Sequence, residues 1–385
     1  MSSQTVRIAW RERAAELVAS SEEYLTTGIF GDAANISGTV VAYYRGAAWA
    51  CERACGFDPD SLCEETIPQL ESLRRFALDE ALHHLMAEEP DQARGVLSEH
   101  LALRTRALAD PLVVRDTYSD SSHSQPTFPH GGTEHWLGRL FLKRFSDTAI
   151  VNGKNVEITL RPATESIEAA RTRAIALAQR SLPQLAHELF GSVHHVVLYR
   201  AAQPYSGYTI SAPLFVFVAE QTFERDEVAA ELLIHECLHQ KLSDISVIRS
   251  LLRPDYVDSE SATIAVPWSF GSDRIRRFSA DRSFAAFHVY AHQSLLYLGM
   301  LATSKSESAA KLAADNLVLS WARAAHFDRE FSTGPIRDEW GPDGYRFVEW
   351  LSHALWEIGK FRLPDGTILS SHADAFARPK TAADI

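Results

Sequence analysis

The feature that most constrains this chain is a His-Glu-x-x-His motif, formed by His235, Glu236 and His239 within VAAELLIHECLHQKLSDI. Residues four apart on an α-helix share one face, so the two imidazoles stand side by side and can bind one metal ion. Three apolar residues at helical spacing share that face: Val228, Leu232 and Leu242. Both histidines are therefore expected to point into an apolar environment on an amphipathic helix.

The sequence around the motif favours a metal site over a pair of core histidines. A strand is predicted at 212–220 (APLFVFVAE), and the helix follows it over about 223–252, with Thr222 as a candidate N-cap. Glu236 lies about 100° around the helix from His235, and from there its side chain can reach the ion or one of its ligands. Two core histidines would each need a hydrogen-bond partner, and the neighbouring sequence offers none.

Periodicity along the rest of the chain predicts an α+β fold that is predominantly α-helical, with a small sheet packed beside the metal-binding helix. A Ser-, Pro- and Gly-rich stretch at 116–135 predicts a long loop. The predicted regions are a helical N-terminal region at 1–115, a loop or linker at 116–150, a metal-binding catalytic domain at 151–372 and a polar tail at 373–385. Helices are predicted at 8–25, 38–56, 65–87, 91–108, 164–190, 281–302, 307–327 and 343–360. Two further strands are predicted at 155–161 and 194–200. The stretch from about 252 to 280 is predicted to be irregular.

Charge and composition restrict the partners. A formal net charge of −12 argues against a nucleic-acid or anionic-membrane surface, because both need clustered basic residues. Four cysteines in 385 residues give no disulfide framework, and the first residues lack the apolar core of a signal peptide. We therefore expect a cytoplasmic protein that acts on a small or peptide substrate, with no nucleic acid and no membrane.

Two histidines do not complete a metal site, and the residues leave the third ligand open. The extended zinc-peptidase motif that continues with Gly and His is excluded, because Leu242 and Ile245 stand at those positions. Glu260 has the spacing of a peptidase ligand supplied by a second helix, but Pro254 and Pro267 bracket it and make a helix doubtful. The helix predicted at 281–302 offers His288 and His292, one turn apart, as further candidates.

Several segments together resemble a known family. The strand APLFVFVAE, the motif in LLIHECLHQKLSD, Pro267-Trp268, the segment HVYAH and GPDGYRFV span about residues 205–352. In these segments the chain resembles the α-ketoglutarate-dependent HExxH-type peptide β-hydroxylases. The resemblance implies Fe(II) as the cofactor, held by His235, His239 and His292, with 2-oxoglutarate and O2 as co-substrates.

The resemblance also implies an arginine between Pro267-Trp268 and the HVYAH helix that binds the co-substrate carboxylate. Ser269 follows Trp268 where an arginine is expected, so Arg282 is the first candidate, followed by Arg277 and Arg276. Glu236 is expected to orient a ligand or a bound water. The implied reaction hydroxylates an unactivated carbon, the β-carbon in that family, of a residue in a peptide or of an amino acid in natural-product biosynthesis.

Two other functions stay open. In a zinc metallopeptidase, His235, His239 and Glu260 would bind Zn²⁺, and Glu236 would deprotonate the attacking water. In a non-catalytic peptide-binding protein, the helix would serve as scaffold, without a metal. The third ligand separates the first two functions, because the hydroxylase requires His292 and the peptidase requires Glu260.

Overall fold

Helices dominate the structure, a computed structural model that describes residues 3–110, 136–148, 150–151, 154–155, 158–160, 164–201, 206–271 and 274–377. A few small sheets accompany them, so the predicted α+β, mostly α-helical class is confirmed. The chain forms two compact units that are interleaved in sequence: unit 1 is Met1–Asp32, Ala176–His187 and Arg249–Ile385, and unit 2 is Ala33–Ile175 and Glu188–Ile248. The predicted domain boundaries stay predictions.

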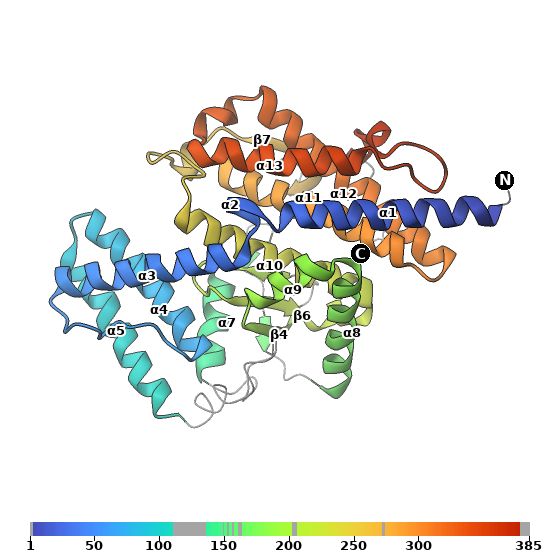
Figure 1. The fold of residues 1–385 in the computed structure, drawn as a ribbon. Coiled ribbons are helices and arrows are strands. Elements are labelled where there is room, and N and C mark those ends of the chain that lie inside the picture. Colours follow the sequence, from blue (N-terminus) through green and yellow to red (C-terminus); the bar gives the residue numbers. More distant parts are fainter. Residues whose placement is uncertain are drawn as a thin grey trace. The chain divides into compact units, whose positions relative to one another are not determined.

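The helices predicted at 38–56, 65–87 and 91–108 are present in unit 2, where they pack against one another as α3 (Ala33–Cys55), α4 (Pro68–Met86) and α5 (Pro90–Leu108) (Figure 1). Proline occupies the first turn of both α4 and α5, where its missing N–H costs no helical hydrogen bond. Cys51 and Cys55 lie on the buried face of α3, so these thiols are core residues. The loop predicted at 116–135 falls outside the described residues.

A four-stranded sheet in the order β3-β4-β6-β5 forms the centre of unit 2. Its inner strands, β4 (His195–Ala201) and β6 (Phe215–Ala219), run parallel and are almost wholly buried. The outer strands, β3 (Ile158–Leu160) and β5 (Ser206–Tyr208), pair antiparallel to them. A run of buried Val, Leu and Phe residues without polar alternation is typical of strands covered on both faces.

Helix α7 (Trp136–Thr148) covers one face of this sheet, so the last part of the region predicted as a loop or linker, 116–150, is helical. Phe141 stacks on Phe215 at 4.0 Å and Phe145 stacks on Phe217 at 4.3 Å between ring centroids. The i, i+4 spacing of these phenylalanines is the helical signal. The loop-like composition before Trp136 obscured it.

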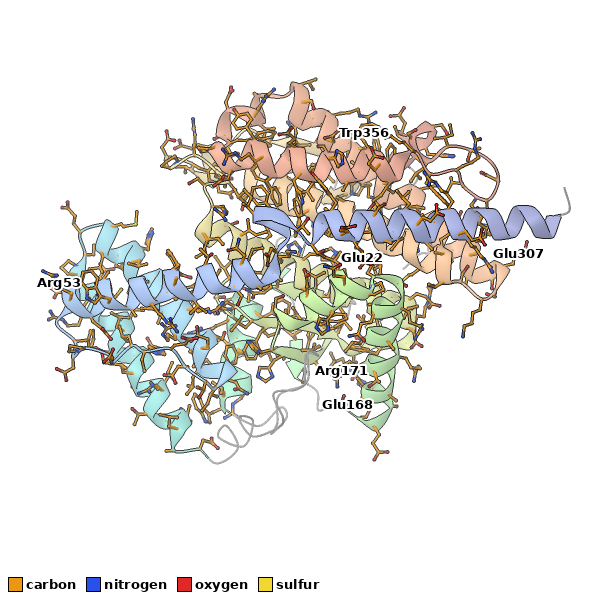
Figure 2. All side chains as sticks on the ribbon, in the orientation of Figure 1. Glu22, Arg53, Glu168, Arg171, Glu307 and Trp356 are labelled. Carbon is orange, nitrogen blue, oxygen red and sulfur yellow. The ribbon has the colours of Figure 1, made fainter. Side chains whose placement is uncertain are left out.

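Two further predictions are corrected by the backbone. The helix predicted at 164–190 is two helices, α8 (Glu165–Ser181) and α9 (Pro183–Gly191), because Pro183 cannot continue the hydrogen-bond ladder of α8. An ion pair between Glu168 and Arg171 spans one turn of α8 (Figure 2). The stretch predicted as irregular contains an antiparallel hairpin, β7 (Ile264–Gly271) and β8 (Arg274–Phe278).

Unit 1 is built on long helices: α1 (Ser3–Leu25), α11 (Ala280–Thr303), α12 (Glu307–Thr333) and α13 (Pro342–Gly359). They match their predicted ranges within a few residues, except that α12 extends to Thr333. Helix α11 packs against α1, α12 and α13, and its Gly299 lies so close to the Ser181 carbonyl oxygen that a Cβ would be 2.1 Å from it. Trp321 is fully buried and donates to the Leu355 carbonyl oxygen at 2.8 Å.

Short elements complete the described chain. They are α2 (Gly28–Gly31), β1 (Ile150–Val151), β2 (Lys154–Asn155) and the 3-10 turns η2 (Glu220–Glu224), η3 (Asp258–Glu260), η4 (Pro335–Glu339), η5 (Leu369–His372) and η6 (Ala375–Ala377). Among the described helices, none is both long and apolar enough to cross a membrane.

Candidate metal centre

The motif lies in the middle of helix α10 (Asp226–Ile248), which follows β6 through the turn η2 and packs against β5, β6 and α3. The helix begins at Asp226, so the predicted N-cap at Thr222 is wrong; Thr222 is buried in η2. Asp226 and Glu227 occupy the first turn, where their negative charge suits the helix dipole. The strand-to-helix context predicted for the motif is confirmed.

His235, Glu236 and His239 converge as a possible metal site. One ligand atom of each residue lies within 4.8 Å of the other two, and the two imidazole centroids are 4.9 Å apart. Ligands that share an ion at about 2.1 Å lie roughly 3–4 Å from one another, so small side-chain rotations would complete the contact. Two imidazoles and a carboxylate are a donor set that fits Fe(II) or Zn²⁺.

The burial of α10 differs from the predicted pattern. The stripe that carries both histidines is only partly buried, whereas Glu236 is 2% exposed and Cys237 is fully buried. Buried residues flank the stripe on both sides, Ile234 and Leu238 on one and Leu233 and Glu236 on the other. Within unit 2, the histidine stripe is therefore more accessible than the residues that flank it.

Glu236 is held by the sheet. Ser206 on β5 donates a hydrogen bond to Glu236 Oε1 at 2.7 Å. Burial is the main cause that raises the pKa of Glu236 to about 8; the hydrogen bond from Ser206 opposes this shift, and the nearby Glu231 adds a smaller increase that is included in that value. Without a cation beside it, the Glu236 carboxyl group keeps its proton at neutral pH; a divalent ion at the histidines would lower this pKa.

His239 is positioned by an aromatic neighbour. The ring of Tyr208 on β5 stacks on the imidazole at 6.5 Å between centroids and 17° between planes. Burial lowers the pKa of His239 to about 4, so the imidazole is neutral at physiological pH and able to bind a metal ion. Sequence reasoning missed Ser206 and Tyr208, because the three-residue strand Ser-Gly-Tyr carries no periodic signal.

The proposed third histidine lies in unit 1, on α11. His292 is fully buried, and its Nδ1 bonds to the His288 carbonyl oxygen at 2.8 Å. This bond makes Nδ1 the protonated nitrogen and leaves Nε2 as the atom with the lone pair. Because His235 and His239 belong to unit 2, the assignment of His292 as a shared ligand stays a prediction.

The remaining predicted residues also belong to unit 1. Arg276, Arg277 and Arg282 are exposed, and Arg277 donates to Thr263 Oγ1 at 2.7 Å. Arg276 and Arg277 are adjacent on β8 and so project to opposite faces. Glu260 is exposed at the end of η3, which confirms the doubt that an α-helix carries it. Which arginine binds the co-substrate stays a prediction.

Comparison of the chain with known protein families finds no matching family model, and comparison with curated proteins finds no match.

Proposed function

We propose that the chain is an Fe(II)- and 2-oxoglutarate-dependent dioxygenase that hydroxylates an unactivated carbon, the β-carbon, of an amino-acid residue in a peptide or of an amino acid. The observation that supports this most directly is the convergence of two imidazoles and one carboxyl group on α10. When bound, Fe(II) with 2-oxoglutarate and O2 supplies the oxidising power, and succinate and CO2 are the co-products.

The residues of the chain have distinct roles in this proposal. His235 and His239 hold the ion as neutral imidazoles, and the resemblance adds His292 as the third ligand. Tyr208 fixes the ring plane of His239 by stacking. Ser206 fixes the Glu236 carboxyl group, which is close enough to the histidines to orient a water or a ligand through a hydrogen bond. An exposed arginine, with Arg282 first, binds the far carboxylate of 2-oxoglutarate.

One observation favours a second function, a zinc metallopeptidase. Glu236 lies where a peptidase needs the base that deprotonates a metal-bound water, within 4.8 Å of both imidazole ligand atoms. The position of Glu260, the candidate third ligand, argues against this function, because Glu260 lies on a three-residue 3-10 turn and not on the second helix that such peptidases use. We therefore rank the dioxygenase first.

An aerobic assay tests the proposal. The protein is supplied with Fe(II) and 2-oxoglutarate, and succinate formation is measured for the wild type, for His235→Ala and for His83→Ala, a control at an exposed histidine of α4. We expect succinate from the wild type and from the control, and none from His235→Ala. Absence of succinate from the wild type, together with peptide cleavage in Zn²⁺, would replace the dioxygenase by the peptidase.

A further inference from the structure

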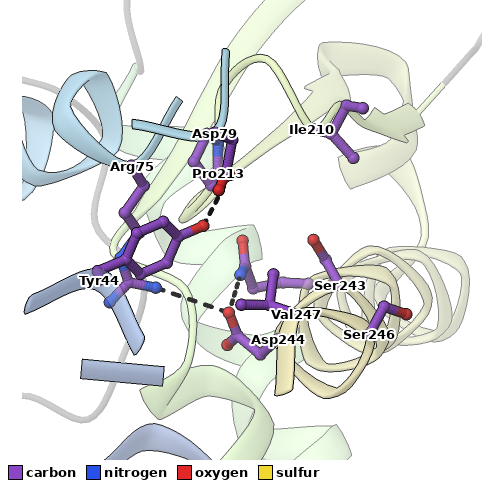
Figure 3. Close-up of a pocket in the computed structure, with 10 residues that line it drawn as sticks. Tyr44, Arg75, Asp79, Ile210, Pro213, Ser243, Asp244, Ser246 and Val247 are labelled. Carbon is purple, nitrogen blue, oxygen red and sulfur yellow. Dashed lines mark hydrogen bonds and ion pairs between the residues drawn. The ribbon is translucent and has the colours of Figure 1, made fainter. Parts of the chain in front are cut away.

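A cavity of about 240 Å³ lies within unit 2, beyond the metal-binding turn of α10 (Figure 3). Helices α3, α4 and α10 and the segment between β5 and β6 supply its lining. The polar part of the lining includes Tyr44, Arg75, Asp79 and Asp244. The function proposed above uses none of these residues, so the cavity needs its own explanation.

The cavity carries an excess of negative charge. The Tyr44 hydroxyl group donates to Asp79 at 2.8 Å, and within the described part of the chain no basic side chain forms an ion pair with Asp79. Asp244 accepts a hydrogen bond from Gln240 at 3.0 Å and lies 3.6 Å from a terminal nitrogen of Arg75. These carboxylates face a cavity in which Arg75 is the single basic lining residue that is described.

Arg75 is itself shared between two carboxylates. It donates to Glu71 at 2.9 Å while it faces Asp244, and Glu71 also pairs with Arg74. Two arginines thus face three neighbouring carboxylates, and Arg75 attracts Asp79 at longer range without forming an ion pair with it. A ligand anion would have to displace Glu71 or Asp244 from Arg75, whereas a ligand cation would complete the charge balance.

The carboxylates and the apolar part of the lining suit a primary ammonium group on a short stem. An ammonium group has three donors for carboxylate and hydroxyl oxygens. The Tyr44 ring is not free to add a cation–π contact, because the Arg75 guanidinium already lies over it, 5.2 Å from the ring centroid. Pro213 and Val247 line the same cavity and offer apolar surface to methylene groups, and Ile210 beside them is 73% exposed. Such an amphipathic lining matches an alkylammonium chain better than a bare metal ion.

The cavity and the metal centre lie on neighbouring turns of α10. Ser243 lines the cavity and lies one helical turn after His239, which corresponds to about 6 Å along the axis. Ile210 follows by two residues the Tyr208 whose ring stacks on His239. A group bound in the cavity therefore lies about one amino-acid side chain away from the metal-binding turn.

We propose that this cavity binds a primary ammonium group of the substrate, held by Asp79 and Asp244, so that the substrate is an amine-bearing amino acid or peptide residue. The identification of the ligand as the substrate rests on the proposed dioxygenase function. The ammonium site itself stands on the cavity and its charges.

The binding test uses n-propylammonium chloride as the probe and sodium propionate as its anionic counterpart, measured by calorimetric titration of the full chain at pH 8. The variants are Asp79→Asn and Asp244→Asn, which keep side-chain size and remove the charge. Glu12→Gln is the control, an exposed acid of α1 that does not line the cavity. We expect propylammonium binding to weaken at least about tenfold in both aspartate variants and to be unchanged in the control.

Preference for propionate, absence of propylammonium binding, or unchanged binding in both aspartate variants would overturn the ammonium site. If Asp244→Asn fails to fold because it loses Arg75 and Gln240, Asp79→Asn decides, since Tyr44 is the one residue that bonds to Asp79 among those described. Thermal unfolding of each variant checks the fold.

A second measurement separates the substrate sources and the two proposals. Succinate formation is compared with no addition, with L-lysine and with Nα-acetyl-lysine amide, which presents the side-chain ammonium group as a peptide residue does. If either compound increases succinate formation by the wild type but not by Asp79→Asn, the result supports the substrate role of the cavity. A larger increase with L-lysine indicates a free amino acid as the substrate, and a larger increase with Nα-acetyl-lysine amide indicates a peptide residue. Stimulation that persists in Asp79→Asn, or stimulation by neither compound, overturns this role. Absence of basal succinate contradicts the dioxygenase and leaves the propylammonium result standing.

Discussion

Two histidine pairs with the same spacing, one on α10 and one on α11, have different surroundings. His235 and His239 are partly buried, and a carboxyl group lies within 4.8 Å of both. His288 and His292 are fully buried, with ring centroids 4.5 Å apart, against Phe347 and Trp350. The i, i+4 spacing that brings two imidazoles together is thus common to both pairs and cannot by itself define a metal centre.

The neighbours of each pair supply the distinction. The α10 pair has an acid fixed by Ser206 and a stacked tyrosine, both from β5. The α11 pair has aromatic rings, and in the described chain it is not part of a cluster of three ligand-type side chains. We infer that His235 and His239 form the core of a metal site and that His288 is a packing residue. His292 differs from His288, because the bond from its Nδ1 leaves the Nε2 lone pair available for a metal ion.

The largest effect is expected from the α10 pair itself. His235→Ala or His239→Ala should lower the affinity for Fe(II) at least about a thousandfold, because one remaining imidazole cannot chelate the ion. Metal content after dialysis, measured by mass spectrometry, checks this. His83→Ala should retain the metal. If His235→Ala and His239→Ala both retain the metal fully, the α10 pair is no more a metal site than the α11 pair.

We expect the two histidines of the α11 pair, His288 and His292, to have different roles. His288→Ala should lower the free energy of unfolding by about 2–4 kcal/mol, because it empties a fully buried position, and should keep the metal. His292→Ala should destabilise the fold comparably and also lose the metal. Urea denaturation and metal content measure the two effects. If His292→Ala retains the metal and Glu260→Ala loses it, the third ligand is a carboxylate and the peptidase gains support.

Much of the fold could be predicted from periodicity, because long amphipathic helices repeat their signal over many turns. The motif helix and its strand were predictable for this reason. Helix α7 was hidden by the loop-like composition before it, and the β7–β8 hairpin by the prolines and charges around it. For such elements, tertiary packing decides the structure more than local preference does.

The metal centre was predictable only in part. The motif fixes which residues share a helix, but its partners Ser206 and Tyr208 come from a three-residue strand that pairs with β6. The cavity needs four segments that are distant in sequence, and Asp79 and Asp244 are 165 positions apart. Spacing along the chain carries no information on such contacts.

The acid beside the α10 pair should make stability depend on pH. The folded protein holds the Glu236 proton up to about pH 8, whereas the unfolded chain releases it near 4.5. The unfolded state therefore binds fewer protons between these values, and the free energy of unfolding falls as pH rises through this window. In metal-free protein, Glu236→Gln should remove this decrease and be more stable than the wild type at pH 8.5, by up to about 5 kcal/mol.

Urea denaturation of chelated protein at pH 5 and pH 8.5 measures this difference. The exposed Glu80→Gln variant is the control and should follow the wild type at both pH values. A Glu236→Gln variant that is less stable than the wild type at pH 8.5 would show that the carboxylate is favourably bound in the folded state. The acid would then be a structural partner of Ser206, and the α10 pair would resemble the α11 pair more closely.

The smallest effect is expected from the aromatic neighbour of the α10 pair. Tyr208→Leu keeps an apolar side chain beside His239 but removes the planar surface that holds the imidazole in one orientation. A ligand that must be reoriented binds less tightly, so Fe(II) affinity should fall about threefold, which corresponds to about 0.6 kcal/mol. Tyr345→Leu, at an exposed tyrosine of α13, is the control. Competition with a chromogenic chelator measures the affinities. An unchanged affinity would assign the orientation of His239 to the helix alone, and a complete loss of metal would make Tyr208 part of the framework that builds the site.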